Sequence, residues 1–126
     1  MAKPILCLDF DGVLHSYTSG WSRIDEIRDP PVPGAMLFLA TAVQYFKVAI
    51  FSSRSATLEG RAAMTGWVQR ALVEEFQGDG YDILDKIDFP SIKPPAKVAI
   101  DDRVITFTGE WPDMQTLLAF QPWNKK

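Results

Sequence analysis

Three short, nearly continuous apolar runs most constrain how this chain can fold. They read "ILCLD" at residues 5–9, "KVAIF" at 47–51 and "KVAI" at 97–100. Runs of this length without alternation of apolar and polar residues are typical of strands that are covered on both faces. Helical patterns lie between them, so the sequence predicts an α/β fold: a doubly wound, three-layer α/β/α sandwich around a mainly parallel, Rossmann-like sheet.

Helical periodicity occupies the segments that follow the first two runs. Residues 35–46 ("AMLFLATAVQYF") carry apolar residues at helical spacing, and a second helix is expected over 58–76. Ser55 or Thr57 is expected to cap this second helix, because a hydroxyl oxygen can accept a hydrogen bond from the first free amides. The two glycines of "QGDGYD" (77–82) predict a break after it.

Shorter elements are expected toward the C-terminus and a long loop near the N-terminus. "KIDF" (86–89) and "VITFTG" (104–109) predict short strands, the second at a sheet edge, and "PDMQTLLAF" (112–120) predicts a final helix. Residues 12–33 lack periodicity and are rich in proline and glycine, so they are expected to form a loop, called the flap below. These elements fit one domain spanning residues 1–126.

Composition and charge narrow the class of protein. Hydrophobic residues make up 47% of the chain and charged residues 23%, which is ordinary for a soluble globular protein. The net charge of −3 does not favour nucleic acid as a partner. The only cysteine, Cys7, lies within an apolar run and is expected to be a buried structural thiol. The sequence shows neither a signal peptide nor a membrane-spanning run, so a cytoplasmic location without a membrane partner is expected.

Polar residues follow each apolar run at the point where the strand should end. They are Asp9 and Asp11, Ser52 and Ser53, and Asp101 and Asp102. Functional sites in open parallel sheets form at the carboxyl ends of the strands, so these side chains are expected to share one edge. Four carboxylates at one edge repel one another, and Mg²⁺ with oxygen ligands is the natural counter-charge. The sequence therefore predicts a magnesium site at this edge.

A metal at an acidic edge makes that edge attractive to a phosphate group, which a hydroxyl and a lysine can also bind. Ser52 supplies the hydroxyl, and either Lys93 or Lys97 supplies the cation. In phosphoryl transfer, a carboxylate nucleophile at the strand end is suited to form an aspartyl-phosphate, and we expect Asp9 to be that nucleophile. Asp11 can then give a proton to the leaving oxygen and later take one from water.

Four segments, taken in order, resemble the four motifs of the haloacid dehalogenase superfamily. They are "LDFDGV" with Asp9 and Asp11, "VAIFS" ending at Ser52, a lysine at Lys93, and "VAIDD" ending at Asp102. The resemblance spans residues 5–102, and longer stretches such as "KPPAKVAIDDR" are similar to small stand-alone members from bacteria and phages. An acid at the second position of the first motif is the phosphatase pattern, which the dehalogenases lack.

The resemblance implies a role for each matching residue. Asp9 would be the nucleophile, and Asp11 the general acid and base with its backbone carbonyl on Mg²⁺. Ser52 would bind the phosphoryl group and Lys93 would stabilise it. Asp101 and Asp102 would hold the metal, so the implied metal site comprises Asp9, Asp11, Asp101 and Asp102. For the lysine, position 93 is favoured over Lys97, which begins the third run and can point to solvent.

Several residues near these motifs are candidates for binding phosphate or substrate. Gly12 allows a sharp exit from the first strand. Ser53 follows Ser52, and one of the two is expected to cap a helix. Arg54 is more often a solvated loop charge than a phosphate ligand. His15 is expected to have a structural or substrate-orienting role. Trp21 can stack on an aromatic substrate or fold over the sheet edge, and both remain open.

For the other three tryptophans, no role in substrate binding is expected. Trp67 has the spacing of a helix core residue, whereas Trp111 and Trp123 flank the final expected helix. We expect all three to be packing residues.

Neither of the two places where the superfamily inserts a cap domain has room for one. Residues 12–52 hold one loop and one helix, and residues 53–93 hold one long helix and a connector. By resemblance to capless members, the site should be open under the flap and able to accept a small phosphorylated molecule or the end of a macromolecule. Two alternatives stay open: a phosphatase acting on a polynucleotide end or nucleotide, and a non-catalytic module that binds metal and phosphate. An oligomer also remains possible.

Overall fold

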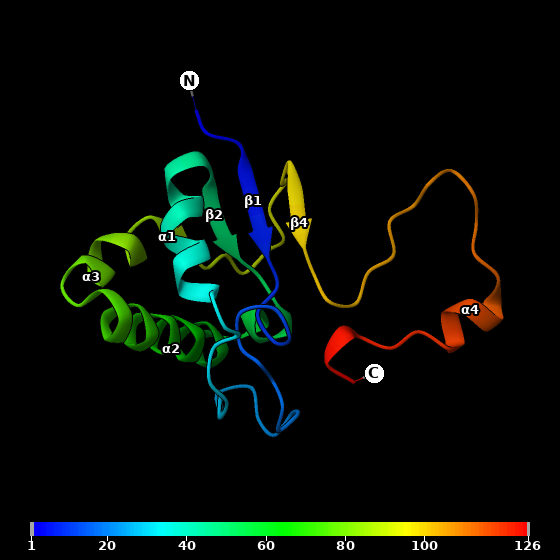
Figure 1. Ribbon diagram of the computed structural model, residues 1–126, viewed down its shortest axis with the longest axis horizontal. Helices are drawn as coiled ribbons and strands as arrows, with labels where there is room; N and C mark the ends of the chain where they lie inside the picture. Colours follow the sequence, from blue (N-terminus) through cyan, green and yellow to red (C-terminus); the bar gives the residue numbers. More distant parts are fainter. Residues whose placement is uncertain (1, 126) are drawn as a thin grey trace.

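A four-stranded parallel sheet organises the protein, whose computed structural model describes residues 2–125 (Figure 1). Its strands are β1 (Ile5–Leu8), β2 (Lys47–Ile50), β3 (Ile87–Asp88) and β4 (Val98–Ile100), in the spatial order β3-β2-β1-β4. All three neighbouring pairs are parallel. The α/β class and the parallel sheet expected from the apolar runs are therefore confirmed.

The helices of the body are α1 (Ala35–Tyr45), the 3₁₀ helix η1 (Ser53–Ala56), α2 (Leu58–Phe76) and α3 (Asp79–Leu84). The two long helices lie where the periodicity predicted them. Of the two expected caps, Thr57 is the one that caps α2, since its hydroxyl accepts a hydrogen bond from the Gly60 N–H at 3.0 Å. Ser55 is a residue of η1 instead.

Helix α3 occupies most of the segment in which a break was predicted. The turn into it is made by Gln77, whose φ of 56° ends α2. A Cβ on Gly80 would lie 2.7 Å from the Leu72 carbonyl of α2, so the absence of a side chain is what lets the two helices pack closely. The glycine that was interpreted as a break is a packing contact between helices.

The core lies between one face of the sheet and the helices α1 and α2. Leu6, Leu8, Val48 and Ile50 project from that face and form one buried cluster with residues of both helices. The helical members of the cluster include Leu39, Val43, Met64, Val68 and Leu72. Burial of apolar surface at about 25 cal/mol per Å² makes this cluster the main source of stability.

The opposite face of the sheet is covered differently from the expectation. Cys7 and Ala49 are buried there, and burial raises the pKa of the Cys7 thiol, in keeping with a structural role. The connection from β3 to β4 runs between opposite edges of the sheet, and its Lys93 lines a hollow with Cys7. Within residues 2–125, α1 and α2 pack into the core on one face, so the three-layer arrangement is present only in part.

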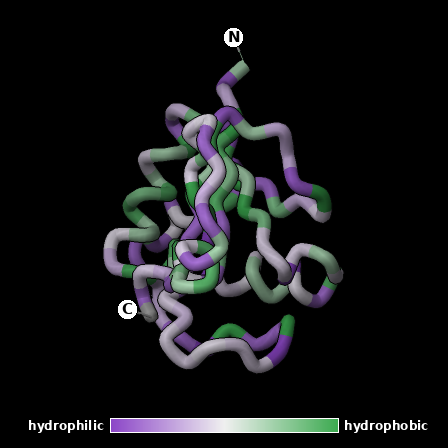
Figure 2. The backbone as a smooth tube through the Cα atoms, turned by 90° about the vertical axis from the view of Figure 1, so that its right-hand side faces the viewer, coloured by the Kyte–Doolittle hydropathy of each residue, from purple (hydrophilic) through white to green (hydrophobic). Residues whose placement is uncertain are grey.

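After β4 the chain leaves the body as an arm, residues 104–119, which carries the short helix α4 (Met114–Leu118) (Figure 1). The segment 104–109 forms no strand, contrary to the prediction, and α4 is shorter than the predicted helix and is capped by Asp113 rather than opened by Pro112. Hydrophobic and hydrophilic residues alternate along the arm, which faces the viewer in Figure 2. Exposed apolar residues of the arm include Val104, Ile105, Phe107, Trp111, Met114, Leu117 and Leu118.

The C-terminal end of the chain returns to the body through η2 (Trp123–Lys125). The Trp123 indole N–H donates to the Gly12 carbonyl at 2.8 Å, and the Asn124 side-chain amide donates to the Ser16 carbonyl at 3.2 Å. Trp67 is a packing residue as predicted, whereas Trp111 is 86% exposed and contacts the ring of Phe107 on the arm. The prediction for Trp111 is therefore wrong, because the chain around it does not fold onto the sheet.

The flap, residues 12–33, is irregular as predicted but anchored at its base. The Val32 N–H donates to the Leu14 carbonyl at 2.8 Å, and the Ser16 N–H donates to the Pro30 carbonyl at 3.0 Å. These bonds bring the two ends of the flap together beside the carboxyl end of β1. Among the helices of the described residues, none is long and apolar enough to cross a membrane.

Candidate metal and phosphate site

The carboxyl ends of β1, β2 and β4 lie side by side, because β1 is hydrogen-bonded to both of the other strands in parallel. The ladder continues one residue beyond the strands, with the Asp9 N–H donating to the Ile100 carbonyl and the Phe51 N–H donating to the Leu8 carbonyl, both at 3.0 Å. Asp9, Ser52 and Asp101 follow directly. The strand-end residues therefore gather at one edge, as the sequence predicted.

Asp9, Asp101 and Asp102 form a cluster in which one carboxylate oxygen of each lies within 4.8 Å of the others. The side chain of Asp102 is only 1% exposed, and neither of its oxygens has a hydrogen-bond partner among the described residues. Arg103 lies 3.6 Å from one of them, which is too long for a hydrogen bond. A buried carboxylate without a hydrogen bond is costly, and a cation is one partner that would stabilise it.

Burial, together with the nearby Asp101 and Asp102 carboxylates, raises the pKa of Asp9 to about 8, although the Phe10 N–H donates a hydrogen bond that opposes this rise. A divalent cation would reverse this balance, because it stabilises the ionised carboxylates that hold it. Three oxygen ligands of this kind suit Mg²⁺, which also keeps positions for water or a phosphate oxygen.

Gly12 determines how close Asp102 can approach the end of β1. Its φ is +84°, which confirms the sharp exit that the sequence predicted, and a Cβ at this position would lie 2.2 Å from Asp102 Oδ2. A side chain at position 12 would therefore displace the buried carboxylate. The requirement for glycine comes from the position of Asp102 as well as from the backbone.

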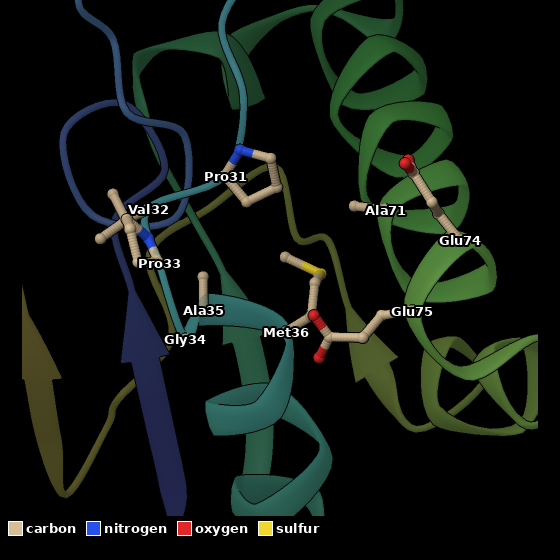
Figure 3. A pocket seen from close by; sticks show the side chains of 9 residues that line it. All are labelled: Pro31, Val32, Pro33, Gly34, Ala35, Met36, Ala71, Glu74 and Glu75. Carbon is tan, nitrogen blue, oxygen red and sulfur yellow. The ribbon is translucent and has the colours of Figure 1, made fainter.

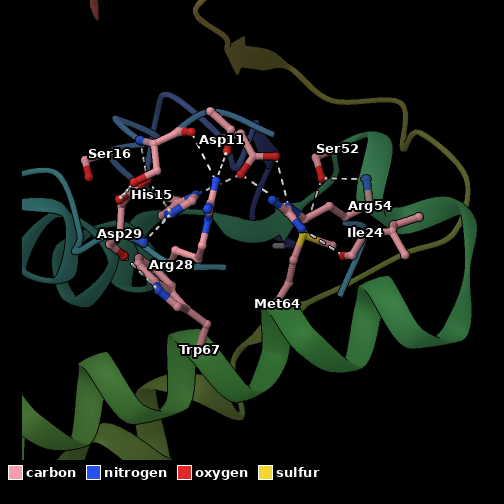
Figure 4. Close-up of polar contacts among 12 residues, drawn as sticks. Asp11, His15, Ser16, Ile24, Arg28, Asp29, Ser52, Arg54, Met64 and Trp67 are labelled. Atoms are coloured by element: carbon pink, nitrogen blue, oxygen red, sulfur yellow. Dashed lines mark hydrogen bonds and ion pairs between the residues drawn. The ribbon is translucent and has the colours of Figure 1, made fainter. Parts of the chain in front are cut away.

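Asp11 lies apart from this cluster and is held by Arg54 and His15 (Figure 4). Arg54 Nε lies 3.2 and 3.0 Å from the two Asp11 oxygens, and His15 Nδ1 lies 2.8 Å from Oδ1. Arg54 is fully buried, and its Nη1 also donates to the carbonyls of Arg23 and Ile24 in the flap. The interpretation of Arg54 as a solvated loop charge is therefore wrong: it ties the flap to Asp11.

His15 is 1% exposed and packs against the rings of Phe10 and Trp67, which also contact each other. The Asp29 backbone N–H donates to His15 Nε2 at 3.0 Å, so Nε2 must be the unprotonated nitrogen of a neutral ring. The proton is then on Nδ1, which donates it to Asp11 Oδ1. His15 therefore has a structural contact, with Asp11, which is one of the two roles that were expected for it.

The two serines after β2 have different environments. Ser52 is buried, and its Oγ accepts from the Arg54 N–H at 3.1 Å, so it is the serine that caps a helix, η1. Ser53 is exposed and lines a hollow with Asp9 and Asp11. The cap bond uses a lone pair of the Ser52 oxygen, so the Ser52 hydroxyl, which donates to Met64 Sδ at 3.4 Å, keeps its capacity to donate. Ser52 and Ser53 both line a hollow that contains Asp9.

The two candidate lysines lie at different places on the sheet. Lys93 lines a hollow together with Asp9, Ser52 and Asp101, although it comes from the connection before β4. The backbone N–H of Lys97 donates to the Ile5 carbonyl, at the opposite end of the strands. The structure therefore places Lys93, the favoured candidate, beside the acids.

Trp21 folds over the edge and still remains half exposed. Its ring lies over the Arg54 guanidinium, 4.7 Å from centroid to Cζ, and it borders the hollow that contains Asp9 and Asp11. Tyr17 and Arg103 border the same hollow and were not predicted. The sequence offered little indication of either residue. Tyr17 lies in the irregular flap, and the only indication for Arg103 was its position directly after the two acids.

A second hollow lies between the end of the flap, the start of α1 and the face of α2 (Figure 3). It is lined by Pro31, Val32, Pro33, Gly34, Ala35, Met36, Ala71, Glu74 and Glu75. None of these residues belongs to the acid cluster or to the Arg54 network. We therefore assign the candidate chemistry to the strand-end edge and not to this hollow.

Comparison of the chain with known proteins supplies no relative from which to transfer a role to these residues. No family model, no curated protein and no solved structure matches it.

Proposed function

We propose that the protein is a Mg²⁺-dependent phosphohydrolase that cleaves a phosphomonoester through an aspartyl-phosphate. One observation carries this proposal: the buried Asp102 carboxylate has no hydrogen-bond partner and lies beside Asp9 and Asp101. A cation is the partner that this arrangement lacks, and Mg²⁺ bound by a few carboxylates at a strand edge characteristically accepts substrate phosphate. When bound, the metal would neutralise charge that develops on the phosphoryl oxygens.

Each residue at the site then has a distinct role in the two steps of the reaction. A carboxylate oxygen of Asp9 attacks phosphorus, and the bond from phosphorus to the leaving oxygen breaks as the bond to Asp9 forms. Asp11 gives its proton to the leaving oxygen. Water then attacks the phosphorus of the aspartyl-phosphate, Asp11 takes a proton from that water, and inorganic phosphate leaves. Ser53 and Lys93 hold the phosphoryl group during both steps, with the Ser52 hydroxyl as the further ligand that the family resemblance implies.

The surroundings of Asp11 hold its carboxylate in place. Like charges were expected to crowd it, but its neighbours are the guanidinium of Arg54 and the Nδ1–H of His15. These contacts fix the position of the carboxylate beside Asp9 without including it in the metal cluster. The role of Asp11 as a proton carrier rests on its place just past the end of β1 and on the family resemblance, which also implies its backbone carbonyl as a metal contact.

The finer features of the fold belong to the same proposal. We propose a haloacid dehalogenase-like hydrolase without a cap domain, in which the flap and η2 border an otherwise open site. Helix α1 and the helices α2 and α3 occupy the two segments in which the superfamily inserts its caps. A doubly wound plan with a second helical layer remains part of this proposal.

The test is release of inorganic phosphate from an aryl phosphate, with and without Mg²⁺, by the wild type and four variants. Asp9→Asn should abolish turnover, and Asp102→Asn should raise the Mg²⁺ concentration needed for half-maximal rate. Asp11→Asn should slow turnover about 100-fold, the lower range for loss of a general acid. Asp82→Asn, at an exposed position of α3, is the matched control and should match the wild type.

Turnover that survives Asp9→Asn would rule out the proposed nucleophile. If the wild type binds Mg²⁺ and inorganic phosphate but hydrolyses no phosphoester in a broad panel, the protein is instead a binding module on this fold.

The alternative of a polynucleotide end as substrate requires a basic, aromatic-lined groove around Trp21. Arg54 is buried and paired with Asp11, and Arg23 pairs with Asp25 at 3.4 Å on the surface. Arg54 therefore does not present its charge to a phosphate backbone, whereas the Arg23 side chain, 71% exposed in a surface pair, is available for one such contact. The arrangement favours a small phosphomonoester over a nucleic-acid strand.

A further inference from the structure

The hollow beside Asp9 carries two aromatic side chains for which the phosphoryl chemistry has no use. Tyr17 and Trp21 come from the flap and line the hollow together with Asp9, Ser53 and Arg103. The acids occupy one side of this hollow, and the flap supplies the aromatic side. A substrate with its phosphorus at Asp9 would extend its leaving group toward these rings.

Trp21 is held in place although it is exposed. Its ring rests on the Arg54 guanidinium, which is fixed in turn by Asp11 and by two flap carbonyls. Even so, 48% of the Trp21 surface remains accessible. A large, rigidly supported aromatic ring that stays accessible beside a reactive carboxylate has the properties of a stacking surface.

Tyr17 is held at the same rim by its backbone and by a ring contact. Its φ of 60° lies in the left-handed region, which a tyrosine adopts only when its surroundings hold it there. The ring packs edge-on against His15, with 5.9 Å between the centroids. The two aromatic residues of the flap are therefore both fixed by the network that positions Asp11.

We propose that Trp21 forms the wall of a subsite for the leaving group, and that the substrate is a small phosphomonoester whose leaving group carries a planar aromatic ring. This inference rests on the proposed function for the position of the phosphate. A planar ring can stack on the open part of Trp21, whereas glycerol or a saturated ring presents no flat surface to it. Arg54 then connects leaving-group binding to the residue that protonates the leaving oxygen.

The decisive test uses two ligands that are matched in size and charge and that cannot be hydrolysed. Benzylphosphonate and cyclohexylmethylphosphonate differ in the planar ring, and their affinities are measured by calorimetry with Mg²⁺ present. Trp21→Ala should weaken benzylphosphonate about 10-fold, the scale of one lost stacking contact, and leave the saturated ligand nearly unchanged. Trp21→Phe should restore most of the loss. Trp111→Ala, on the exposed arm, is the control and should bind like the wild type.

Equal effects of Trp21→Ala on the two phosphonates would overturn the subsite, since they would show that Trp21 only supports Arg54. An assay of phosphomonoester hydrolysis distinguishes failure of the aromatic subsite from failure of the proposed phosphatase function. If the phosphonates are discriminated but no phosphomonoester is hydrolysed, the subsite stands and the phosphatase is refuted.

Two pairs of substrates show whether the planar ring belongs to a simple aryl group or to a nucleoside. The effect of Trp21→Ala on kcat/KM is compared between benzyl phosphate and cyclohexylmethyl phosphate, and between adenosine monophosphate and ribose phosphate. A loss confined to the benzyl pair assigns a ring close to phosphorus, and one confined to the adenosine pair assigns a nucleoside. A loss in neither pair, with turnover intact, contradicts the proposal.

Discussion

At Gly12, two physical requirements meet in one residue. The backbone has a positive φ of +84°, and the Asp102 carboxylate occupies the space where a Cβ would lie. The "DFDG" stretch is thus linked to "VAIDD", about 90 residues later in the chain, by direct contact. A glycine that was expected to allow the chain to leave the first strand also makes room for the Asp102 carboxylate of the acid cluster.

Replacing Gly12 by alanine should destabilise the protein by about 3 kcal/mol, because left-handed strain and a close contact add together. Gly20→Ala separates the two causes. Gly20 has a φ of +74° with no other atom within 4 Å of its would-be Cβ, so only the strain of about 1 kcal/mol should appear. Urea unfolding of both variants measures the difference. Equal losses would contradict the contact with Asp102.

Arg54 shows the same dependence on residues far away in the sequence, here through the pairing of opposite charges. A buried guanidinium and a nearly buried carboxylate compensate each other, so removing one leaves the other without a partner. Arg54→Met should cost about 3 kcal/mol of stability, within the range for breaking a buried ion pair. Adding Asp11→Asn should recover part of the loss, and Arg70→Met at an exposed position is the control. Strictly additive losses in the double variant would exclude the pairing.

Helix α2 shows, at the scale of an element, how local sequence and tertiary contacts can oppose each other. Gly60 and Gly66 both lie inside the helix, where glycine is an unfavourable residue. At Gly60, a Cβ would lie 1.9 Å from the Arg54 carbonyl oxygen, which is backbone and cannot move aside. At Gly66, the nearest atom is the flexible end of the Arg70 side chain at 3.3 Å. Gly60 is retained because η1 must pack against α2.

Alanine at these two positions should therefore have effects of opposite sign. Gly66→Ala should stabilise the protein by about 0.5–1 kcal/mol through helix propensity. Gly60→Ala should destabilise it by about 2 kcal/mol because η1, with Arg54, must shift away. Thermal unfolding of the two variants measures both changes in stability. Stabilisation by both alanines would show that η1 does not pack closely against α2.

Local pattern was sufficient to predict some elements and not others. β1, β2, α1 and α2 are apolar runs or periodic helices whose own residues fill the core, so their sequences specify them. β4 was also predicted from its apolar run, although its three residues are exposed beside β1. Helix α3 was missed because Gly80, a helix breaker by propensity, is required there by the close approach of Leu72. The predicted strand over 104–109 needs a partner beside β4, and pairing of that kind cannot be deduced from propensity.

The candidate site was predictable to a similar extent. Strand-end position alone indicated the three acids, the serines and the edge that they share, because parallel strands bring their ends together. The burial of Arg54 was not predictable, since its partners Asp11 and the flap carbonyls lie at least 30 positions away in the sequence. Tyr17 and Arg103 join the site through loop geometry, which leaves no periodic signal.

At the scale of the whole molecule, the chain divides into a packed body and an exposed arm. Residues 104–119 carry exposed apolar side chains, while Trp123 and Asn124 fasten the C-terminal end to the base of the flap. The Trp123 indole N–H donates to the Gly12 carbonyl, so this C-terminal segment contacts the same turn that lies against Asp102 of the acid cluster. The arm therefore begins just after β4, and the segment that follows it returns to the base of the flap, so both ends of the arm are joined to the region of the candidate site.

This division predicts the pattern of limited proteolysis. Chymotrypsin should cut first at Phe107, Trp111 or Leu117, because the arm has exposed backbone and few bonds to the body. The aromatic residues of the core, such as Phe10 and Trp67, should remain protected. Mass spectrometry of the first fragments identifies the sites. First cleavage within α1 or α2 would show that the arm is packed more firmly than the body.

The central claim is that the Asp9 carboxylate becomes phosphorylated, and trapping the phosphoenzyme tests it most directly. The protein is mixed with a radiolabelled aryl phosphate and Mg²⁺, quenched in acid within the first turnover, digested and sequenced by mass spectrometry. The account predicts label on the peptide that contains Asp9, and none for Asp9→Asn or without Mg²⁺. Hydrolysis in the wild type without labelled protein, or label on a residue other than Asp9, would contradict it.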